Sequence, residues 1–251
     1  MLPVLQVGPL AIPVYPLSLL LAIWVALAVG AWAARYQGLS GDHIYNAGLY
    51  GLVAGVVVAR LAHVITFWSA YRAQPLEIVG FNTRAFIGWP GLVAALVVAG
   101  WYIRRHRLPW ARMADAGALG ALLGVSIACL GAFLAGQGLG APTALPWGIT
   151  AWDVPRHPFQ LYGMLATLAM AGLVAWVLTR RKRPGVAALV ALAGCGLAAL
   201  LIDPARAESL AAVGGLRVVQ LLGLAALVLA LWGLRRRLEQ SPDETPRPNT
   251  H

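Results

Sequence analysis

The sequence predicts an all-α, polytopic integral membrane protein with about seven transmembrane helices. Of its 251 residues, 60% are hydrophobic and only 11% are charged, whereas a soluble domain averages about 25% charged residues. The apolar residues also gather in runs of about 20, the length that crosses the hydrocarbon core of a bilayer as a helix. A chain of this composition has too little polar surface to cover itself in water, which excludes a soluble globular domain.

Prolines, glycines and basic clusters divide the apolar sequence into seven runs. We expect spans at Leu17–Arg35, Ile44–Trp68, Phe86–Ile103, Ala114–Ala135, Phe159–Leu178, Gly185–Ile202 and Leu216–Leu234. Residues 1–238 then form a single transmembrane domain. The remaining segment, 239–251, is polar and rich in proline, so it is expected to be a disordered tail on the cytoplasmic side.

The basic residues predict the orientation of these spans. Thirteen of the nineteen Lys and Arg residues fall at one set of alternate helix ends, and Arg60 lies within a span. The other five fall at the opposite set of ends: Arg72, Arg84, Arg156, Arg206 and Arg217. An excess of Lys and Arg marks the cytoplasmic side, so the N-terminus is expected outside and the C-terminus in the cytoplasm. The net charge of +10 therefore reflects topology and contact with anionic headgroups rather than a nucleic-acid partner.

The first sixteen residues contain no Lys or Arg. They lack the basic n-region of a cleavable signal peptide. We interpret them as an exported, proline-broken segment that leads into the first span.

The segment Ala141–Met164 is the longest stretch that does not resemble a membrane helix. It holds four prolines, which prevent helix formation, and the predicted topology places it on the outer face. Arg156, His157, Gln160 and Tyr162 lie at its C-terminal end. Two interpretations remain: an interfacial anchor, since Trp, Tyr and Arg gather at headgroup depth, or a functional cap over a polar site.

Arg60 and His63 are candidate binding residues within the second span. A charge inside a span costs about 2.5–3.5 kcal/mol on insertion scales and marks a functional site by default. The spacing of three residues places both side chains on one helix face, where they can hold an anionic headgroup while the imidazole moves a proton. The alternative is that Arg60 extends to the interface or pairs with a carboxylate, and that His63 packs against neighbours.

Asp203 and Arg206 follow the sixth span and reach the same outer boundary as Arg156. Two arginines at one level can bind a phosphate through their forked donors, or these residues form an ordinary charged loop. The two cysteines, Cys129 and Cys195, lie in apolar runs without CxxC spacing, so neither a disulfide framework nor a metal site is expected.

Several motifs resemble those of the bacterial prolipoprotein diacylglyceryl transferase family. PTALPWGI and RHPFQLY are similar to the family's PT-x-LPWG and RHP-x-QLYE at a similar separation. VARLAHV, IACLGAFLAGQGLG and LLIDPARAES resemble further family segments in the same order. The resemblance extends over nearly the whole chain.

The resemblance implies an activity and a set of partners. The family transfers diacylglyceryl from phosphatidylglycerol to the thiol of a lipobox cysteine in a prolipoprotein signal peptide, in the bacterial cytoplasmic (inner) membrane and without a cofactor or metal. Arg60 and Arg206 match two family arginines, and Asp203 stands where the family has a glutamate. His157, Gln160 and Tyr162 match within RHP-x-QLY, with Arg156 just before them.

Five family positions differ in this chain, and each has lost a polar or charged group. The family's histidine, arginine, asparagine, acid and glutamate fall on Ile87, Cys129, Ala132, Gln137 and Gly163.

Two interpretations follow from these differences. The chain is an active transferase in which His63, at a family tyrosine position, serves as the base, and Arg60 and Arg206 clamp the phosphate. Alternatively, it is an inactive or repurposed relative that binds phospholipid or an envelope protein.

Overall fold

The computed structural model describes residues 4–80, 85–138, 140–151, 153–180, 183–207 and 217–239. Its helices are α1 (Val14–Tyr36), α2 (Asp42–Thr66), α3 (Trp68–Tyr71), α4 (Gly88–Arg105), α5 (Trp110–Leu134), α6 (Phe159–Arg180), α7 (Val186–Ile202) and α8 (Val218–Glu239). Two short hairpins pair β1 (Val4–Val7) with β2 (Leu10–Pro13), and β3 (Ile149–Ala151) with β4 (Val154–Arg156). Two 3-10 turns are η1 (Pro75–Ile78) and η2 (Asp203–Ala205).

The predicted spans correspond to the long helices, so the polytopic all-α class is confirmed. Six described helices are long and apolar enough to cross a membrane: α1, α2, α5, α6, α7 extended by η2, and α8. The seventh long helix, α4, has 18 residues and ends in Arg104 and Arg105. At 1.5 Å per residue it is about 27 Å long, close to the thickness of the hydrocarbon core. The orientation and the seventh crossing stay predictions.

Two parts of the chain differ from the sequence expectations. The N-terminal segment forms an antiparallel hairpin in which Val4 pairs with Pro13, where only a proline-broken stretch was expected. Glu239, placed in the tail by the sequence, is the last residue of α8 and its carboxylate contacts Arg235 Nε at 2.6 Å. The rest of the predicted tail, residues 240–251, lies outside the described residues.

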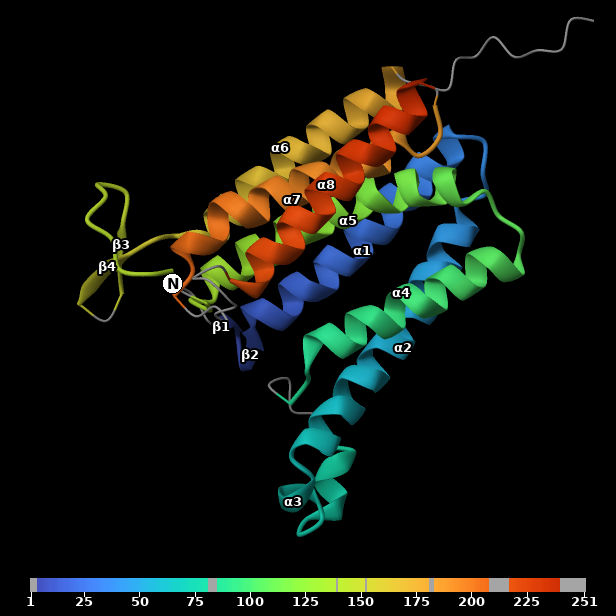
Figure 1. Ribbon diagram of the computed structural model, residues 1–251. Coiled ribbons are helices and arrows are strands. Elements are labelled where there is room, and N and C mark those ends of the chain that lie inside the picture. Colours follow the sequence, from blue (N-terminus) through green and yellow to red (C-terminus); the bar gives the residue numbers. More distant parts are fainter. Residues whose placement is uncertain are drawn as a thin grey trace, which may run out of the picture.

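The helices form a five-helix bundle and a separate pair. Figure 1 shows α1, α5, α6, α7 and α8 running alongside one another, whereas α2 and α4 form an antiparallel pair that diverges from the bundle toward α3. We call this pair, with α3 and η1, the α2–α4 arm. The β3–β4 hairpin projects from the end of the bundle where α6 begins.

Glycines allow the close helix contacts. Because lipid chains are as apolar as leucine, helices in a bilayer associate through packing rather than through the hydrophobic effect. A Cβ added at Gly51 would lie 2.9 Å from the Ala95 carbonyl oxygen across the α2–α4 contact, and one at Gly196 would lie 2.5 Å from the Gly223 carbonyl oxygen across α7–α8. A Cβ at Gly120 would collide with the Ala26 carbonyl oxygen across α1–α5.

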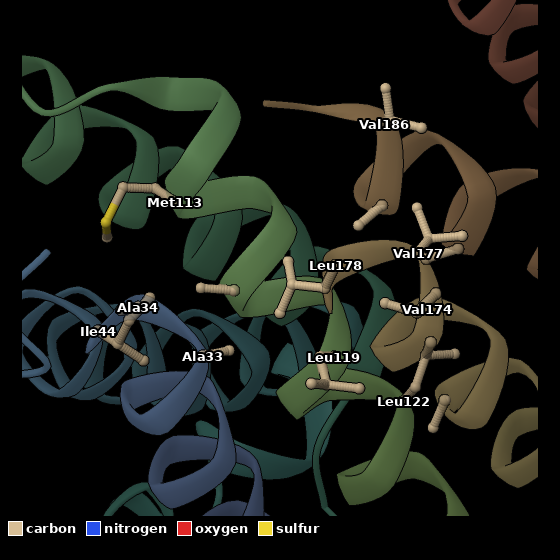
Figure 2. Packing of buried hydrophobic residues seen from close by; sticks show 14 of the residues in the cluster. Ala33, Ala34, Ile44, Met113, Leu119, Leu122, Val174, Val177, Leu178 and Val186 are labelled. Carbon is tan, nitrogen blue, oxygen red and sulfur yellow. The ribbon is translucent and has the colours of Figure 1, made fainter. Parts of the chain in front are cut away.

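The largest buried cluster lies toward one end of the bundle. Its members come from the end of α1, the beginnings of α2, α5 and α7, and the end of α6, and Figure 2 shows Ala34, Ile44, Met113, Val177 and Val186 among them. This is the end opposite to the β3–β4 hairpin. Many large apolar side chains outside the cluster are exposed, such as Leu20 at 67% and Ile65 at 72%, which suits a surface facing lipid.

Candidate functional site

The loop between α5 and α6 closes, by backbone hydrogen bonds, onto the end of the bundle where α6 begins. The Ala141 amide donates to the Ala205 carbonyl at 2.8 Å, and the His157 amide donates to the Ala141 carbonyl at 3.0 Å. Gly140 forms an antiparallel bridge with Arg206. A Cβ at Gly140 would lie 2.7 Å from both the Ala205 oxygen and the His157 Cβ, so the approach requires glycine. The loop therefore joins the α6 and α7 ends of the bundle.

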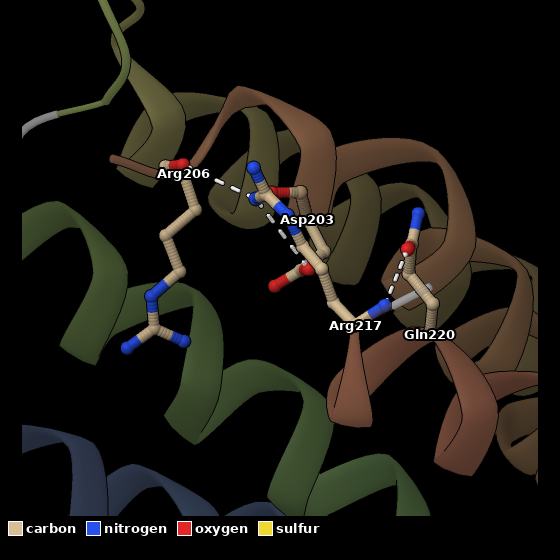
Figure 3. Close-up of polar contacts among 4 residues, drawn as sticks. All are labelled: Asp203, Arg206, Arg217 and Gln220. Atoms are coloured by element: carbon tan, nitrogen blue, oxygen red, sulfur yellow. Dashed lines mark hydrogen bonds and ion pairs between the residues drawn. The ribbon is translucent and has the colours of Figure 1, made fainter. Parts of the chain in front are cut away.

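Arg206 leaves this junction with its side chain exposed. Its amide donates to the Asp203 carbonyl at 3.0 Å, which ends the η2 turn. The guanidinium carbon lies 5.7 Å from the centroid of the Phe159 ring, a cation–π distance. Figure 3 shows the Arg206 side chain extending away from the neighbouring Asp203 and Arg217. This arginine is held in place by its backbone and offers its charge at the surface of the site.

Asp203 is buried, and it belongs to the support of this junction rather than to its surface. Only 3% of it is exposed, and its Oδ2 lies 3.7 Å from Arg217 Nη1. The same nitrogen donates to the carbonyls of Asp203 at 2.6 Å and Arg206 at 3.2 Å, and the Arg217 amide donates to Gln220 Oε1 at 3.1 Å (Figure 3). Arg217 thus ties the beginning of α8 to Arg206. The sequence indicated Arg217 only as one of the outer arginines.

The residues of RHPFQLY lie together at the same end. Tyr162 Oη accepts a hydrogen bond from Trp147 Nε1 at 2.8 Å and lies 3.3 Å from His157 Nδ1. Arg156 Nη1 donates to the Gly140 carbonyl at 3.3 Å. Trp147 was not a predicted site residue, although it is the tryptophan of the PT-x-LPWG motif. The two motifs are therefore linked by a Trp–Tyr–His series of contacts.

Gln160 secures the other side of the loop from inside the bundle. It is 3% exposed, and its Nε2 donates to the carbonyls of Gln137 and Gly138. Its Oε1 is buried and has no hydrogen-bond partner among the described residues. An acceptor in this state costs free energy.

Arg60 and His63 lie on α2, and the α2–α4 arm diverges from the bundle, whose helix α7 leads to Arg206 (Figure 1). Arg60 donates from Nε to the Ile78 carbonyl at 3.2 Å, from Nη1 to Ala85 at 3.0 Å and from Nη2 to Glu77 at 2.6 Å. It therefore fastens the chain around η1 to the end of α2. A guanidinium has five N–H groups, so one hydrogen remains on each terminal nitrogen.

His63 lies on the same arm and packs against its neighbours there. Its Nδ1 lies 3.3 Å from Tyr71 Oη, and its ring centroid lies 4.7 Å from that of Phe67. The structure thus brings His63 and Arg60 to one local cluster, and Arg156, His157, Gln160, Tyr162, Asp203 and Arg206 to another.

The five positions that depart from the family motifs also divide between the α2–α4 arm and the bundle. Ile87 is on the arm, where its amide donates to the Ala59 carbonyl at 3.1 Å. Ala132 and Gln137 are joined at the end of α5 by a backbone hydrogen bond of 2.9 Å. Cys129 and Gly163 are neighbours, because a Cβ at Gly163 would lie 3.3 Å from Cys129 Sγ. The resemblance gives the family an arginine and a glutamate at these two neighbouring positions, so a pair of opposite charges is absent as a unit.

Over the described ranges, no three His, Cys, Asp or Glu side chains converge in a way that could hold a metal ion.

A family model described as prolipoprotein diacylglyceryl transferase matches residues 3–236. A relative from Gloeobacter violaceus is 31% identical over 250 residues, covering 93% of each chain, and one from Solidesulfovibrio magneticus is 30% identical over 255 residues, covering 95% of this chain and 94% of the relative. A third, from Thermosynechococcus vestitus, is 27% identical over 259 residues and covers 96% of each. All three relatives are named phosphatidylglycerol–prolipoprotein diacylglyceryl transferase.

Proposed function

Because this chain belongs to the prolipoprotein diacylglyceryl transferase family, we propose that it transfers diacylglyceryl from phosphatidylglycerol to the thiol of a lipobox cysteine in a prolipoprotein. A thiolate attacks the glyceryl carbon that carries the phosphate. A C–S bond forms, the C–O bond to phosphate breaks, and glycerol phosphate leaves with the electron pair. The thiol proton passes to a base on the protein.

The junction of Arg206 with the loop carries this proposal. The Gly140–Arg206 bridge and the hydrogen bonds of Ala141 join the arginine to the chain that bears Arg156 and His157. A positive charge fixed beside the leaving phosphate stabilises the transition state more than the ground state, and removing one such donor costs about 10²–10³ in rate. Arg206 is the proposed group for this role, and Asp203 and Arg217 position it.

Two imidazoles are candidates for the base. The resemblance to the family favours His63, which stands at a family tyrosine position, whereas His157 belongs to the same cluster as Arg206. His157 Nδ1–H can donate to Tyr162 Oη, which also accepts from Trp147 Nε1. This tautomer would leave Nε2 unprotonated and able to accept the thiol proton. Arg60 is the proposed headgroup ligand on the arm, through the two N–H groups that the carbonyls leave unused.

The proposed setting is the bacterial cytoplasmic membrane, with the site on its outer face. The donor is phosphatidylglycerol or another anionic phospholipid, and the acceptor is an exported signal peptide. No nucleic-acid partner is proposed, because the basic residues cluster at helix ends.

A second candidate is a family member that binds phospholipid or an envelope protein without performing the transfer. The neighbouring Cys129 and Gly163 favour it. Replacing one member of a buried ion pair leaves an uncompensated charge, whereas replacing both with apolar groups is often neutral. Loss of the pair therefore preserves the fold while removing charges from the site.

The distinguishing experiment is complementation of a strain depleted of its own transferase. We expect the wild-type chain to restore lipidated prolipoprotein. Arg206→Ala should lower lipidation by about 10²-fold. Arg72→Ala removes another exposed arginine that the sequence also places on the outer side, and it should behave as wild type.

Absence of lipidation by wild-type protein that is inserted in the membrane would reject the transfer and favour the second candidate. Full activity of Arg206→Ala would reject the assignment of the leaving-group charge while leaving the activity in place.

A further inference from the structure

A cavity of about 440 Å³ lies at the end of the bundle opposite to Arg206. It is formed where α1 and α6 end and where α5 and α7 begin. Its polar lining consists of Tyr36, Gln37, Arg112, Asp115, Thr179 and Arg183. Nothing in the proposed transfer uses this cavity.

The carboxylate in this cavity, that of Asp115, already accepts hydrogen bonds from the protein backbone. Asp115 is 2% exposed, and its two oxygens accept hydrogen bonds from the Gly185 amide at 2.6 Å and the Ala188 amide at 2.7 Å. It therefore caps the beginning of α7, and its charge is compensated by the positive end of the helix. The carboxylate therefore repels an incoming anion only weakly, because the amide groups at the beginning of α7 offset its charge.

The two arginines keep most of their donors. Arg112 is exposed, and among the described residues its side chain makes one long hydrogen bond, from Nη1 to the Gln37 carbonyl at 3.5 Å. Arg183 uses only Nη1, which lies 3.1 Å from the carbonyls of Arg237 and of Leu238. Within the described chain, the Nε and Nη2 groups of both have no recorded partner. These donors come from different elements and line one cavity, unlike a row of arginines along a helix end.

The neighbouring surface extends the positive charge and adds apolar area. A second cavity of about 510 Å³ is lined by Leu189, Trp232, Gly233, Arg236 and Arg237. The linings of the two cavities are in contact. Arg237, which lines the second cavity, donates from Nη1 to the carbonyl of Pro184, which lines the first, at 3.3 Å. The Arg236 guanidinium carbon lies 3.9 Å from the Trp232 ring centroid. An amphipathic ligand would meet phosphate-binding arginines beside aromatic and aliphatic side chains.

We propose that Arg112 and Arg183 bind the phosphate of an anionic phospholipid headgroup in this cavity. Arginine presents forked donors that match two phosphate oxygens, and basic pockets between membrane helices at the cytoplasmic side hold anionic headgroups. The orientation predicted from the basic residues puts this end in the cytoplasm. The lipid would brace α1, α5, α6 and α7 at the end of the bundle where the buried cluster lies.

The test compares four purified proteins: wild type, Arg112→Gln, Arg112→Gln/Arg183→Gln, and the control Arg104→Gln/Arg105→Gln. The control removes two exposed arginines at the end of α4 that line neither of these two cavities. Phosphatidylglycerol is titrated into neutral detergent micelles, and bound lipid is counted by native mass spectrometry. Any lipid at the Arg206 end is common to all four proteins and cancels in the comparison.

We expect the double variant to bind one lipid about tenfold more weakly than wild type or the control, with Arg112→Gln between them. Equal binding by all four proteins would overturn the proposal, and so would an equal loss in the control, which would indicate surface charge alone. If the double variant does not fold, Arg112→Gln decides, because the Arg112 side chain makes only that one long hydrogen bond among the described residues.

A parallel titration with inorganic phosphate follows the melting temperature. Phosphate should stabilise the wild type only weakly. Strong stabilisation by phosphate that Arg112→Gln abolishes, without any effect of lipid, would overturn the lipid assignment in favour of a free anion.

Discussion

The two imidazoles of the candidate site differ in what surrounds them. His157 lies at the junction that carries Arg206 and contacts Tyr162, whereas His63 contacts Tyr71 and Phe67 on the α2–α4 arm. A general base must come within hydrogen-bond reach of the proton it removes. The imidazole nearer to the leaving-group charge is therefore the better placed of the two.

Replacing each imidazole separately tests this assignment. We expect His157→Asn, which keeps a hydrogen-bonding side chain but cannot act as the base, to slow transfer to a lipobox peptide by about 10²-fold. His63→Phe preserves the ring contact with Phe67 and should leave the rate within a few-fold of wild type. The initial rate is measured for the wild type and for both variants under the same conditions. The reverse pattern would assign the base to His63.

The Cys129–Gly163 contact predicts how the interior responds to charge. We expect Cys129→Arg alone to destabilise the protein by about 3 kcal/mol, because it adds an unpaired charge within the bundle. Adding Gly163→Glu should recover about 1–3 kcal/mol through the restored pair. Unfolding of the two single variants and the double variant in detergent gives the coupling energy. Strictly additive effects would show that the two positions do not interact.

At the scale of helices, the lines of contact between neighbouring helices, which we call seams, depend on glycine. Gly51 and Gly55 on α2 and Gly120 and Gly124 on α5 each form a G-x-x-x-G spacing that faces a neighbouring helix backbone. Such spacing lets backbones approach closely where lipid supplies no hydrophobic driving force. The α1–α5 seam runs the length of the bundle beneath the site, so its packing sets the position of the loop.

Two glycines on one helix separate this effect from helix propensity. A Cβ at Gly120 would collide with α1, whereas one at Gly117 would have no atom within 4 Å. We expect Gly120→Val to destabilise the protein by about 1–3 kcal/mol through overpacking, and Gly117→Val to be nearly neutral. Thermal unfolding in detergent measures both. Similar melting temperatures for the two variants would contradict the packing argument.

At the scale of the whole molecule, the site and the arginine-lined cavity lie at opposite ends of the bundle. The charge bias of the sequence predicts that the two ends lie at different membrane faces, with the site outside. The assignment depends on the charge bias of the sequence and on whether α4 completes a crossing.

Single cysteines in a Cys129→Ala/Cys195→Ala background test the topology. A membrane-impermeant thiol reagent applied to intact cells should label Gln74→Cys and Leu145→Cys but not Arg107→Cys. Labelling of Arg107→Cys alone would reverse the orientation. Labelling of Gln74→Cys and Arg107→Cys without Leu145→Cys would mean that α4 does not cross.

The sequence by itself determined the membrane class, the positions of the long helices and the family. These depend on composition, on apolar runs and on local motifs, which act over short stretches of chain. The sequence did not predict the hairpin at Val4–Pro13, because its prolines indicated only an absence of helix. Trp147 and Arg217 were not predicted because each gains its role from a partner in another element, 15 residues away for Trp147 and 14 for Arg217.

Only the tertiary structure decided which candidate residues share a site. Arg60 and Arg206 were predicted to clamp one phosphate, yet they lie on the arm and on the bundle (Figure 1). Similarly, Asp203 proved to be buried against Arg217, and Cys129 proved to neighbour Gly163. The physical reason is that helix direction follows from local sequence, whereas the angle between helices follows from side-chain packing across the seams, and that angle decides which helix ends meet.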